Sequence, residues 1–218
     1  MALPTLLDLV NKMLIRMREE EVTAIVGDEY ATLVKAFVND AKSQVEDAHD
    51  WSAYLTDIVV TTAAGTTGYS LTGSGNRIKI DTVVNTTAPG VMKEMPRRKI
   101  KQEILLGTIQ DSRPSYWANN GVDASGDAQV LLYPNPVATE SLTFTGWVRP
   151  AALDADTDTL TIPELPVVLL ALSFMARERG EVGGTTSAEY FELAKRSLGD
   201  EIAYDSARND DEDTWYWS

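Results

Sequence analysis

Apolar residues recur at helical spacing in the first 50 residues. Thr5 with Asp8 three positions later predicts a capped helix start. The apolar residues that follow recur at helical spacing, with partners three or four positions away: Leu6, Leu7, Val10, Met13, Leu14 and Met17. Gly27 and Asp28 interrupt the pattern, and a longer apolar run follows that ends near Asp50. We therefore expect two helices in this part of the chain.

The middle of the chain alternates apolar and polar residues, which is the pattern of half-buried strands. This pattern predicts strands near residues 69–71, 78–80 and 142–147, and the apolar runs within 57–62 and 130–133 predict two more. Glycine- and proline-containing turns separate them. The stretch Arg97–Leu106 fits either a short helix or a strand.

Helical spacing returns after residue 160. Pro163 and Pro166 fall in the first turn, where a missing N–H costs least, and Gly180 predicts the stop. Thr186 with Glu189 forms a second capping-box pattern. Two further helices are therefore predicted.

Neither helical flank is long enough to bury its apolar faces alone, so we expect the two flanks to pack together. The predicted fold is α+β, an antiparallel four-helix bundle with an inserted antiparallel β-rich domain. Residues 1–57 and 151–208 are the two halves of the bundle, 58–150 the inserted domain, and 209–218 an acidic-aromatic C-terminal tail.

The net charge also differs between the helical flanks and the middle of the chain. The chain carries 19 basic and 33 acidic residues, a net charge of −14. Counted by segment, the net charge is −6 for residues 1–57, +2 for 58–150 and −10 for 151–218. Gripping DNA requires lysine and arginine to neutralise phosphates, so this excess of acid argues against a DNA-binding protein.

Composition excludes several kinds of site. The absence of cysteine excludes disulfides, thiolate metal ligands and a cysteine nucleophile, and the single His49 excludes a multi-histidine metal site. No apolar run approaches the roughly 20 residues that span a bilayer. The stretch Met1–Met17 lacks the apolar core of a signal peptide. We expect a soluble protein with no cofactor and no membrane partner.

One local pattern matches only the beginning of a metal-binding loop. Asp154, Asp156 and Asp158 begin like a calcium-binding loop, but Thr159 replaces the required glycine and Leu165 the bidentate glutamate. A polar loop entering a helix is the favoured interpretation.

His49 lies beside Asp47 and Asp50 at the end of a predicted helix, and the chain has no G-x-S-x-G nucleophile motif. The favoured role of His49 is to stabilise the helix dipole. With no base, nucleophile and oxyanion donor visible together, we do not expect an enzyme.

One basic cluster stands out: Arg97, Arg98, Lys99 and Lys101. It could be a solvated edge, or it could contact phosphates or an acidic partner surface. In a chain this acidic, an identical neighbour is a natural partner, which favours a head-to-tail ring. These four residues are the inter-subunit candidates.

The C-terminal tail joins an acidic block to an aromatic one. Its candidate partner-binding residues are Asp210, Asp211, Glu212, Asp213, Trp215, Tyr216 and Trp217. Aromatic residues at a chain end are typical interface anchors. The alternatives are a tail that folds back on its own helices and a tail that docks on a partner.

A different class of function also remains open. Tyr116, Trp117 and Trp147 lie in the β-rich region, where exposed aromatic rings could stack on sugars. This pattern would fit a monomeric carbohydrate- or ligand-binding module.

The order of several stretches points to a known family. These are Ser112–Trp117, Val130–Pro136, Leu142–Trp147, Leu153–Asp158 and Ile162–Leu165, the last opening an Ala- and Leu-rich helix. Together with the N-terminal helix pair, they resemble the head-to-tail connector adaptors of tailed bacteriophages, particularly the tail tubular protein A type of short-tailed phages. The resemblance covers nearly the whole chain as an order of elements.

The resemblance implies a structural virion protein without catalysis, located at the head–tail junction after assembly in the host cytoplasm. It implies a helical bundle with an inserted β domain and a ring, commonly dodecameric, beneath the portal protein. The portal would bind on one side, through the helical part and the tail, and the tail tube or nozzle protein on the other. DNA would pass through without specific binding, since an acidic lumen repels phosphates.

Overall fold

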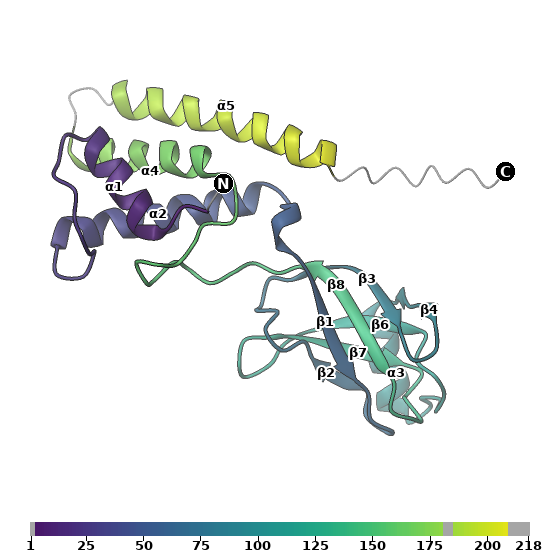
Figure 1. Ribbon diagram of the computed structural model, residues 1–218. Helices are drawn as coiled ribbons and strands as arrows, with labels where there is room; N and C mark the ends of the chain where they lie inside the picture. Colours follow the sequence, from purple (N-terminus) through teal and green to yellow (C-terminus); the bar gives the residue numbers. More distant parts are fainter. Residues whose placement is uncertain (1–2, 181–184, 209–218) are drawn as a thin grey trace. The chain divides into compact units, whose positions relative to one another are not determined.

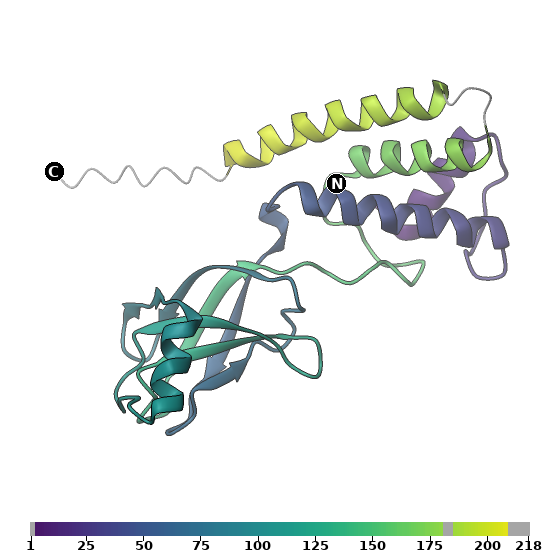
Figure 2. The same cartoon turned by 180° about the vertical axis from the view of Figure 1, so that it is seen from behind.

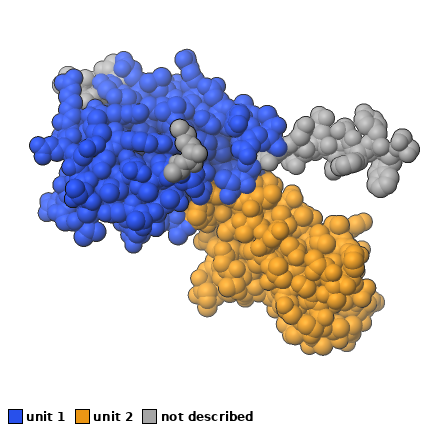
Figure 3. All heavy atoms as spheres, in the orientation of Figure 1, with its two compact units in different colours: residues 1–53, 151–218 blue, residues 54–150 orange. Residues whose placement is uncertain are grey.

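The computed structural model describes residues 3–180 and 185–208. The chain divides into two compact units, coloured separately in Figure 3. The first, called the helical unit, contains residues 1–53 and 151–218, and the second, called the β unit, contains residues 54–150. The helical unit is therefore built from two segments that are distant in the sequence.

Four helices form the described part of the helical unit: α1 (Leu6–Arg16), α2 (Glu29–Ala48), α4 (Glu164–Glu178) and α5 (Thr185–Arg208). The predicted capping box is confirmed, because the side chains of Thr5 and Asp8 each accept the other residue's backbone N–H. Asp28 caps α2 by accepting the N–H of Ala31 at 2.8 Å. Local side-chain chemistry thus sets both helix starts.

Helix α4 lies between α2 and α5, and the short α1 packs on α2 and α4 (Figures 1 and 2). Because α4 has neighbours on several sides, most of its residues are buried, including Val167, Leu170, Leu172 and Met175. On its α2 side, the rings of Phe37 and Phe174 lie 6.4 Å apart.

The predicted four-helix bundle is wrong, although the α+β class is right. Four helices around one shared core would each bury a single stripe, whereas α4 is buried on several sides as the middle helix. A fifth helix, α3 (Arg97–Leu106), belongs to the β unit instead. The chain therefore has five helices and two separate sheets among its described residues.

The β unit contains two four-stranded sheets. The first has the order β1 (Leu55–Thr61), β8 (Ser141–Trp147), β3 (Lys79–Asn85) and β4 (Gly90–Val91). The second has the order β2 (Gly68–Ser70), β7 (Ala128–Tyr133), β6 (Tyr116–Val122) and β5 (Lys93–Glu94). The strands of the predicted antiparallel domain pair antiparallel except for β5, which pairs in parallel with β6, and the prediction is corrected at this one pair.

One apolar core lies between the two sheets. Val60, Leu142 and Phe144 come from the first sheet and Trp117, Val130 and Leu132 from the second. The opposite face of the second sheet carries Ala118 and Leu131, which pack against Ile100 of α3. The run Val130–Leu132 is apolar at every position because both faces of β7 are covered.

The chain enters and leaves the β unit side by side. Leu55 at the start of β1 pairs with Trp147 at the end of β8, and the N–H of Val148 donates to the carbonyl of Tyr54 at 2.9 Å. In the helical unit, the returning chain is held by α2, because Nζ of Lys42 donates to the carbonyl of Ala151 at 3.1 Å.

Candidate functional site

The predicted basic cluster lies at the start of α3. Its anchor is Ile100, which is fully buried against Ala118 and Leu131. Arg97, Arg98 and Lys99 are exposed and Lys101 is half-buried. Nε of Arg97 donates to Oδ1 of Asn120 at 3.2 Å. The structure therefore brings all four predicted cations together on one short helix.

Three of these cations have no side-chain partner within the part of the chain that the structure describes. Among the residues that the structure describes, no hydrogen bond, ion pair or ring contact engages the side chains of Arg98, Lys99 or Lys101. By contrast, Lys12, Lys35 and Arg113 each contact a carboxylate. The cluster is thus a concentration of unpaired positive charge in a chain with a net charge of −14.

Helix formation does not account for this cluster. Cations are unfavourable near the N-terminus of a helix, where the dipole is already positive. Pro96 caps α3 without a side-chain hydrogen bond, and the first turn contains no acidic residue. The three cations of the first turn, Arg97, Arg98 and Lys99, make the helix less stable by itself, so the cluster calls for an explanation other than helix formation.

Two exposed leucines end the same helix. The side chains of Leu105 and Leu106 are 83% and 74% exposed, although their neighbour Ile104 packs against the core. Gly107 then ends the helix in the left-handed conformation, with φ of 65°. Neither leucine belongs to a predicted site. Residues Ile104–Leu106 are apolar at three successive positions, although a helix that buries one face does not need an apolar residue at each of them. This run is the signal in the sequence for apolar side chains exposed at the end of the helix.

The predicted tail site lies outside the described residues. Asp210, Asp211, Glu212, Asp213, Trp215, Tyr216 and Trp217 all belong to residues 209–218. Their role in binding a partner stays a prediction. The described chain ends with Arg208, the last residue of α5.

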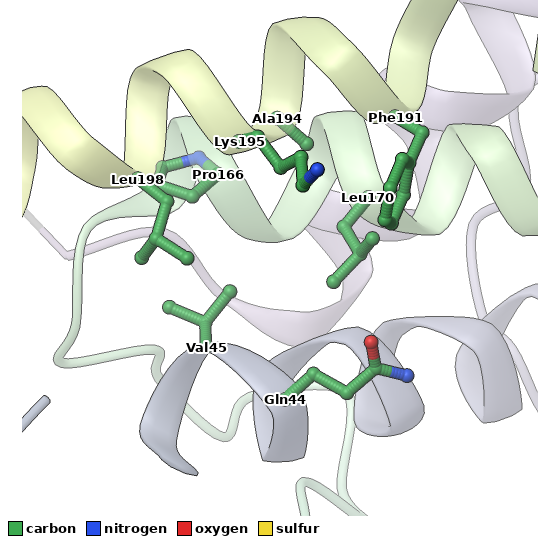
Figure 4. A pocket seen from close by; sticks show the side chains of 8 residues that line it. All are labelled: Gln44, Val45, Pro166, Leu170, Phe191, Ala194, Lys195 and Leu198. Atoms are coloured by element: carbon green, nitrogen blue, oxygen red, sulfur yellow. The ribbon is translucent and has the colours of Figure 1, made fainter. Parts of the chain in front are cut away.

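A small apolar pocket lies between α2, α4 and α5 (Figure 4). Its volume is about 160 Å³, and its walls include Val45, Leu170, Phe191 and Leu198. Gln44 and Lys195 are the only polar side chains among the eight that line it. None of the eight described residues that line this pocket carries a carboxylate, hydroxyl or imidazole, so they can receive an apolar group but supply no acid–base pair.

The structure brings His49, Ser52 and Asp205 together, but not as a catalytic triad. In a triad the histidine bridges the serine and the acid. Here Asp205 is the central residue. Its carboxylate accepts the Ser52 hydroxyl and the Ser52 N–H, and its Oδ2 lies 3.1 Å from Nε2 of His49. The serine hydroxyl is engaged by the acid, so this cluster ties α5 to the end of α2.

The carboxylates of Asp154, Asp156 and Asp158 each bind different protein groups rather than converging on one point. Asp154 contacts Nζ of Lys35 at 2.7 Å, and Asp156 accepts the N–H of Ile25 at 3.2 Å. Asp158 accepts the N–H groups of Asp154 and Ala155, and these hydrogen bonds hold the pKa of Asp158 below its ordinary value. These contacts therefore join the loop that follows the β unit to α2 and to the turn before α2.

The aromatic residues considered for sugar binding do not form a platform. Trp117 is only 6% exposed and meets Phe144 edge-on inside the core. Tyr116 and Trp147 lie in different sheets, and the Trp147 ring is covered by Nζ of Lys79 at 5.1 Å. Sugar stacking requires exposed ring faces, so this arrangement does not favour a carbohydrate-binding module.

Two further findings concern the described residues alone. None of their helices combines the length and the apolar character needed to cross a bilayer. Residues 3–180 and 185–208 also contain no group of three or more His, Cys, Asp or Glu side chains placed to hold a metal ion.

Comparison with known proteins identifies the family. The model of the SU10 adaptor protein family matches residues 4–216 of the 218-residue chain. The chain belongs to the SU10 adaptor protein family. A search of curated proteins finds no match.

Membership in the SU10 adaptor family confirms the resemblance to phage head-to-tail adaptors that the ordered motifs indicated. The match runs through both units and into the tail segment, so it concerns the whole architecture. It assigns a structural adaptor role in a bacteriophage. The narrower likeness to tail tubular protein A stays a prediction.

Proposed function

We propose that this SU10-family chain forms a ring that joins the portal protein to the tail tube or nozzle at the head–tail junction of the virion. The family match over residues 4–216 is the observation that carries the proposal. The ring is assembled in the host cytoplasm and, by the resemblance to connector adaptors, contains twelve copies.

Head-to-tail association requires two different, complementary patches on each chain. The unpaired cations of α3 supply one patch. The acidic flanks supply the other, since residues 151–218 alone carry a net charge of −10. A basic patch that meets an acidic patch on an identical neighbour favours a ring over a two-fold dimer.

In this proposal the domain assignment follows the predicted segments. Residues 1–57 and 151–208, with the tail 209–218, contact the portal and neighbouring subunits. The inserted domain, residues 58–150, contacts the tail component. The proposed adaptor performs no catalytic step, and the only histidine, His49, is engaged with Asp205.

The ring also forms part of the DNA conduit. A strongly acidic lumen repels phosphates, so the genome can slide without being held. The net charge of −14 supports this role, and only 19 of the 218 residues are basic.

Electron microscopy of the chain mixed with its portal protein tests the proposal. We expect annular particles that add one layer to the portal ring. The chain without portal is the control. Particles of the portal alone, with the added chain remaining monomeric, would contradict the adaptor function and would reopen the ligand-binding alternative.

A further inference from the structure

We propose that the outward face of α3 and the C-terminal tail of a second copy of the chain form one contact between neighbouring subunits. The outward face consists of Arg98, Lys99, Lys101, Leu105 and Leu106. The inference rests on the proposed ring and names the two segments that join its subunits.

The outward face combines charge and apolar surface in a fixed order. Residues three, four and seven positions apart share one side of a helix, so Arg98, Lys101 and Leu105 lie along one row. Lys99 and Leu106 lie beside this row, and the buried Ile100 is on the other side. With a rise of 1.5 Å per residue, Arg98 and Leu105 are separated by about 10 Å along the helix.

The tail has the complementary order. Its acidic block, Asp210–Asp213, precedes its aromatic block, Trp215–Trp217. Trp215 follows Asp211 by four positions, which is about 6 Å in a helix and about 13 Å in an extended chain. The 10 Å spacing on α3 lies within this range. The acids can therefore meet the cations while the aromatic rings cover the leucines.

Both halves of the contact are chemically matched. Carboxylates form charge-assisted hydrogen bonds with arginine and lysine, and three cations of α3 have no partner among the described residues. Indole and phenol rings bury a large apolar area, and Leu105 and Leu106 are among the most exposed large apolar side chains described.

Other occupants match less of this surface. DNA phosphates would pair with the cations but leave Leu105 and Leu106 uncovered. The apolar pocket beside α5 is a second destination for the aromatic block. To reach that pocket in its own chain, however, the tail would run back past Asp200 and Glu201, so acid would face acid.

Disulfide trapping tests the contact directly, because the natural chain contains no cysteine. One full-length population carries Leu105→Cys and a second carries Tyr216→Cys, and the two are mixed under a mild oxidant. We expect a cross-linked dimer at a yield about tenfold above the control mixture, because docking raises the local concentration of the two thiols. The control replaces Leu105→Cys with Val26→Cys, a site in the helical unit that is 88% exposed.

Charge reversal provides the second measurement. Arg98→Glu with Lys101→Glu, added to the Leu105→Cys chain, should reduce the yield to the control level. Asp211→Lys with Asp213→Lys, added to the Tyr216→Cys chain, should restore it. Equal yields with the Val26→Cys control would overturn the contact. A chain carrying both Leu105→Cys and Tyr216→Cys that closes only on itself would also overturn it.

The cross-linking experiment and the electron microscopy of the ring can give different results. Annular particles on the portal without the cross-link would refute this contact and leave the adaptor function standing. A cross-link without annular particles would support the contact and refute the ring.

Discussion

Asp205 of α5 accepts two hydrogen bonds from Ser52, a residue 153 positions earlier in the chain. One comes from the backbone N–H of Ser52 at 2.9 Å and the other from its hydroxyl. Ser52 lies at the boundary where the chain leaves the helical unit. Burial would by itself raise the pKa of Asp205, but the bonds from Ser52 and the contact with His49 outweigh burial and lower this pKa. The pair therefore joins the two sequence-distant halves of the helical unit.

Replacing Asp205 should destabilise the protein. Asp205→Ala leaves the Ser52 donors unpaired in a half-buried site, which we expect to lower the free energy of unfolding by about 1–2 kcal/mol. Urea denaturation at pH 7 measures the change. Asp200→Ala, at an exposed position of the same helix, is the control and should change stability by less than about 0.5 kcal/mol.

The stabilisation that Asp205 provides should decrease at acidic pH. Because the folded-state pKa of Asp205 is lowered, its stabilisation is present above the unfolded value of about 3.9 and is lost as the pH falls through the folded value. The difference between wild type and Asp205→Ala should therefore shrink between pH 5 and the acid limit of folding. An unchanged difference over that range would contradict the account.

Breaking the buried ion pair of α2 should lower the free energy of unfolding more than breaking an exposed ion pair. Nζ of Lys42 lies 2.7 Å from Oε1 of Glu46, and both side chains are buried. Lys42→Met removes the cation that lies beside the buried carboxylate of Glu46 and should cost about 3–5 kcal/mol in unfolding experiments. Adding Glu46→Met should recover the part of this loss that comes from the buried charge, but not the part that comes from the hydrogen bond between Lys42 and the carbonyl of Ala151. Lys195→Met, which breaks an exposed contact with Glu192, should cost less than about 1 kcal/mol.

Gly146 is required by a close approach between β8 and β3. A Cβ atom at this position would lie 2.5 Å from the carbonyl oxygen of Lys79, which is backbone and cannot move aside alone. Gly146→Ala should therefore destabilise the β unit by about 1–3 kcal/mol. The control is Gly68→Ala, whose nearest neighbour would be a Leu131 methyl group at 3.8 Å. Equal thermal unfolding of the two variants would contradict this interpretation.

DNA should not bind the chain. In fluorescence anisotropy at physiological salt, we expect the dissociation constant for duplex DNA to be weaker than the roughly 10⁻⁴ M limit of non-specific binders. A basic DNA-binding protein of similar mass serves as the positive control. Micromolar binding by this chain would contradict the proposed DNA-repelling conduit.

Local patterns predicted much of the secondary structure. The capping pair Thr5 and Asp8 and the alternation in Leu142–Trp147 are short-range signals, and both elements form where expected. The stretch Arg97–Leu106 stayed ambiguous because its conformation depends on packing. It is helical where Ile100 docks on Ala118 and Leu131, which are distant in the sequence.

Long-range relationships could not be predicted in the same way. No local signal joins Ser52 to Asp205, or pairs the two-residue strand β5 in parallel with β6. Leu165, in the stretch that opens the Ala- and Leu-rich helix, is 49% exposed, and its exposure depends on the neighbours of α4, which no local pattern indicates. For the candidate site, the basic residues of α3 could be predicted from sequence, but their unpaired state and the exposed leucines required the structure.

The mass of the assembly in solution tests the central claim most directly. Native mass spectrometry of the chain bound to its portal protein should show one closed species containing many copies of the 23.9 kDa chain, with twelve expected. A chain that keeps the mass of one copy, both alone and in the presence of portal, would contradict the ring-forming adaptor.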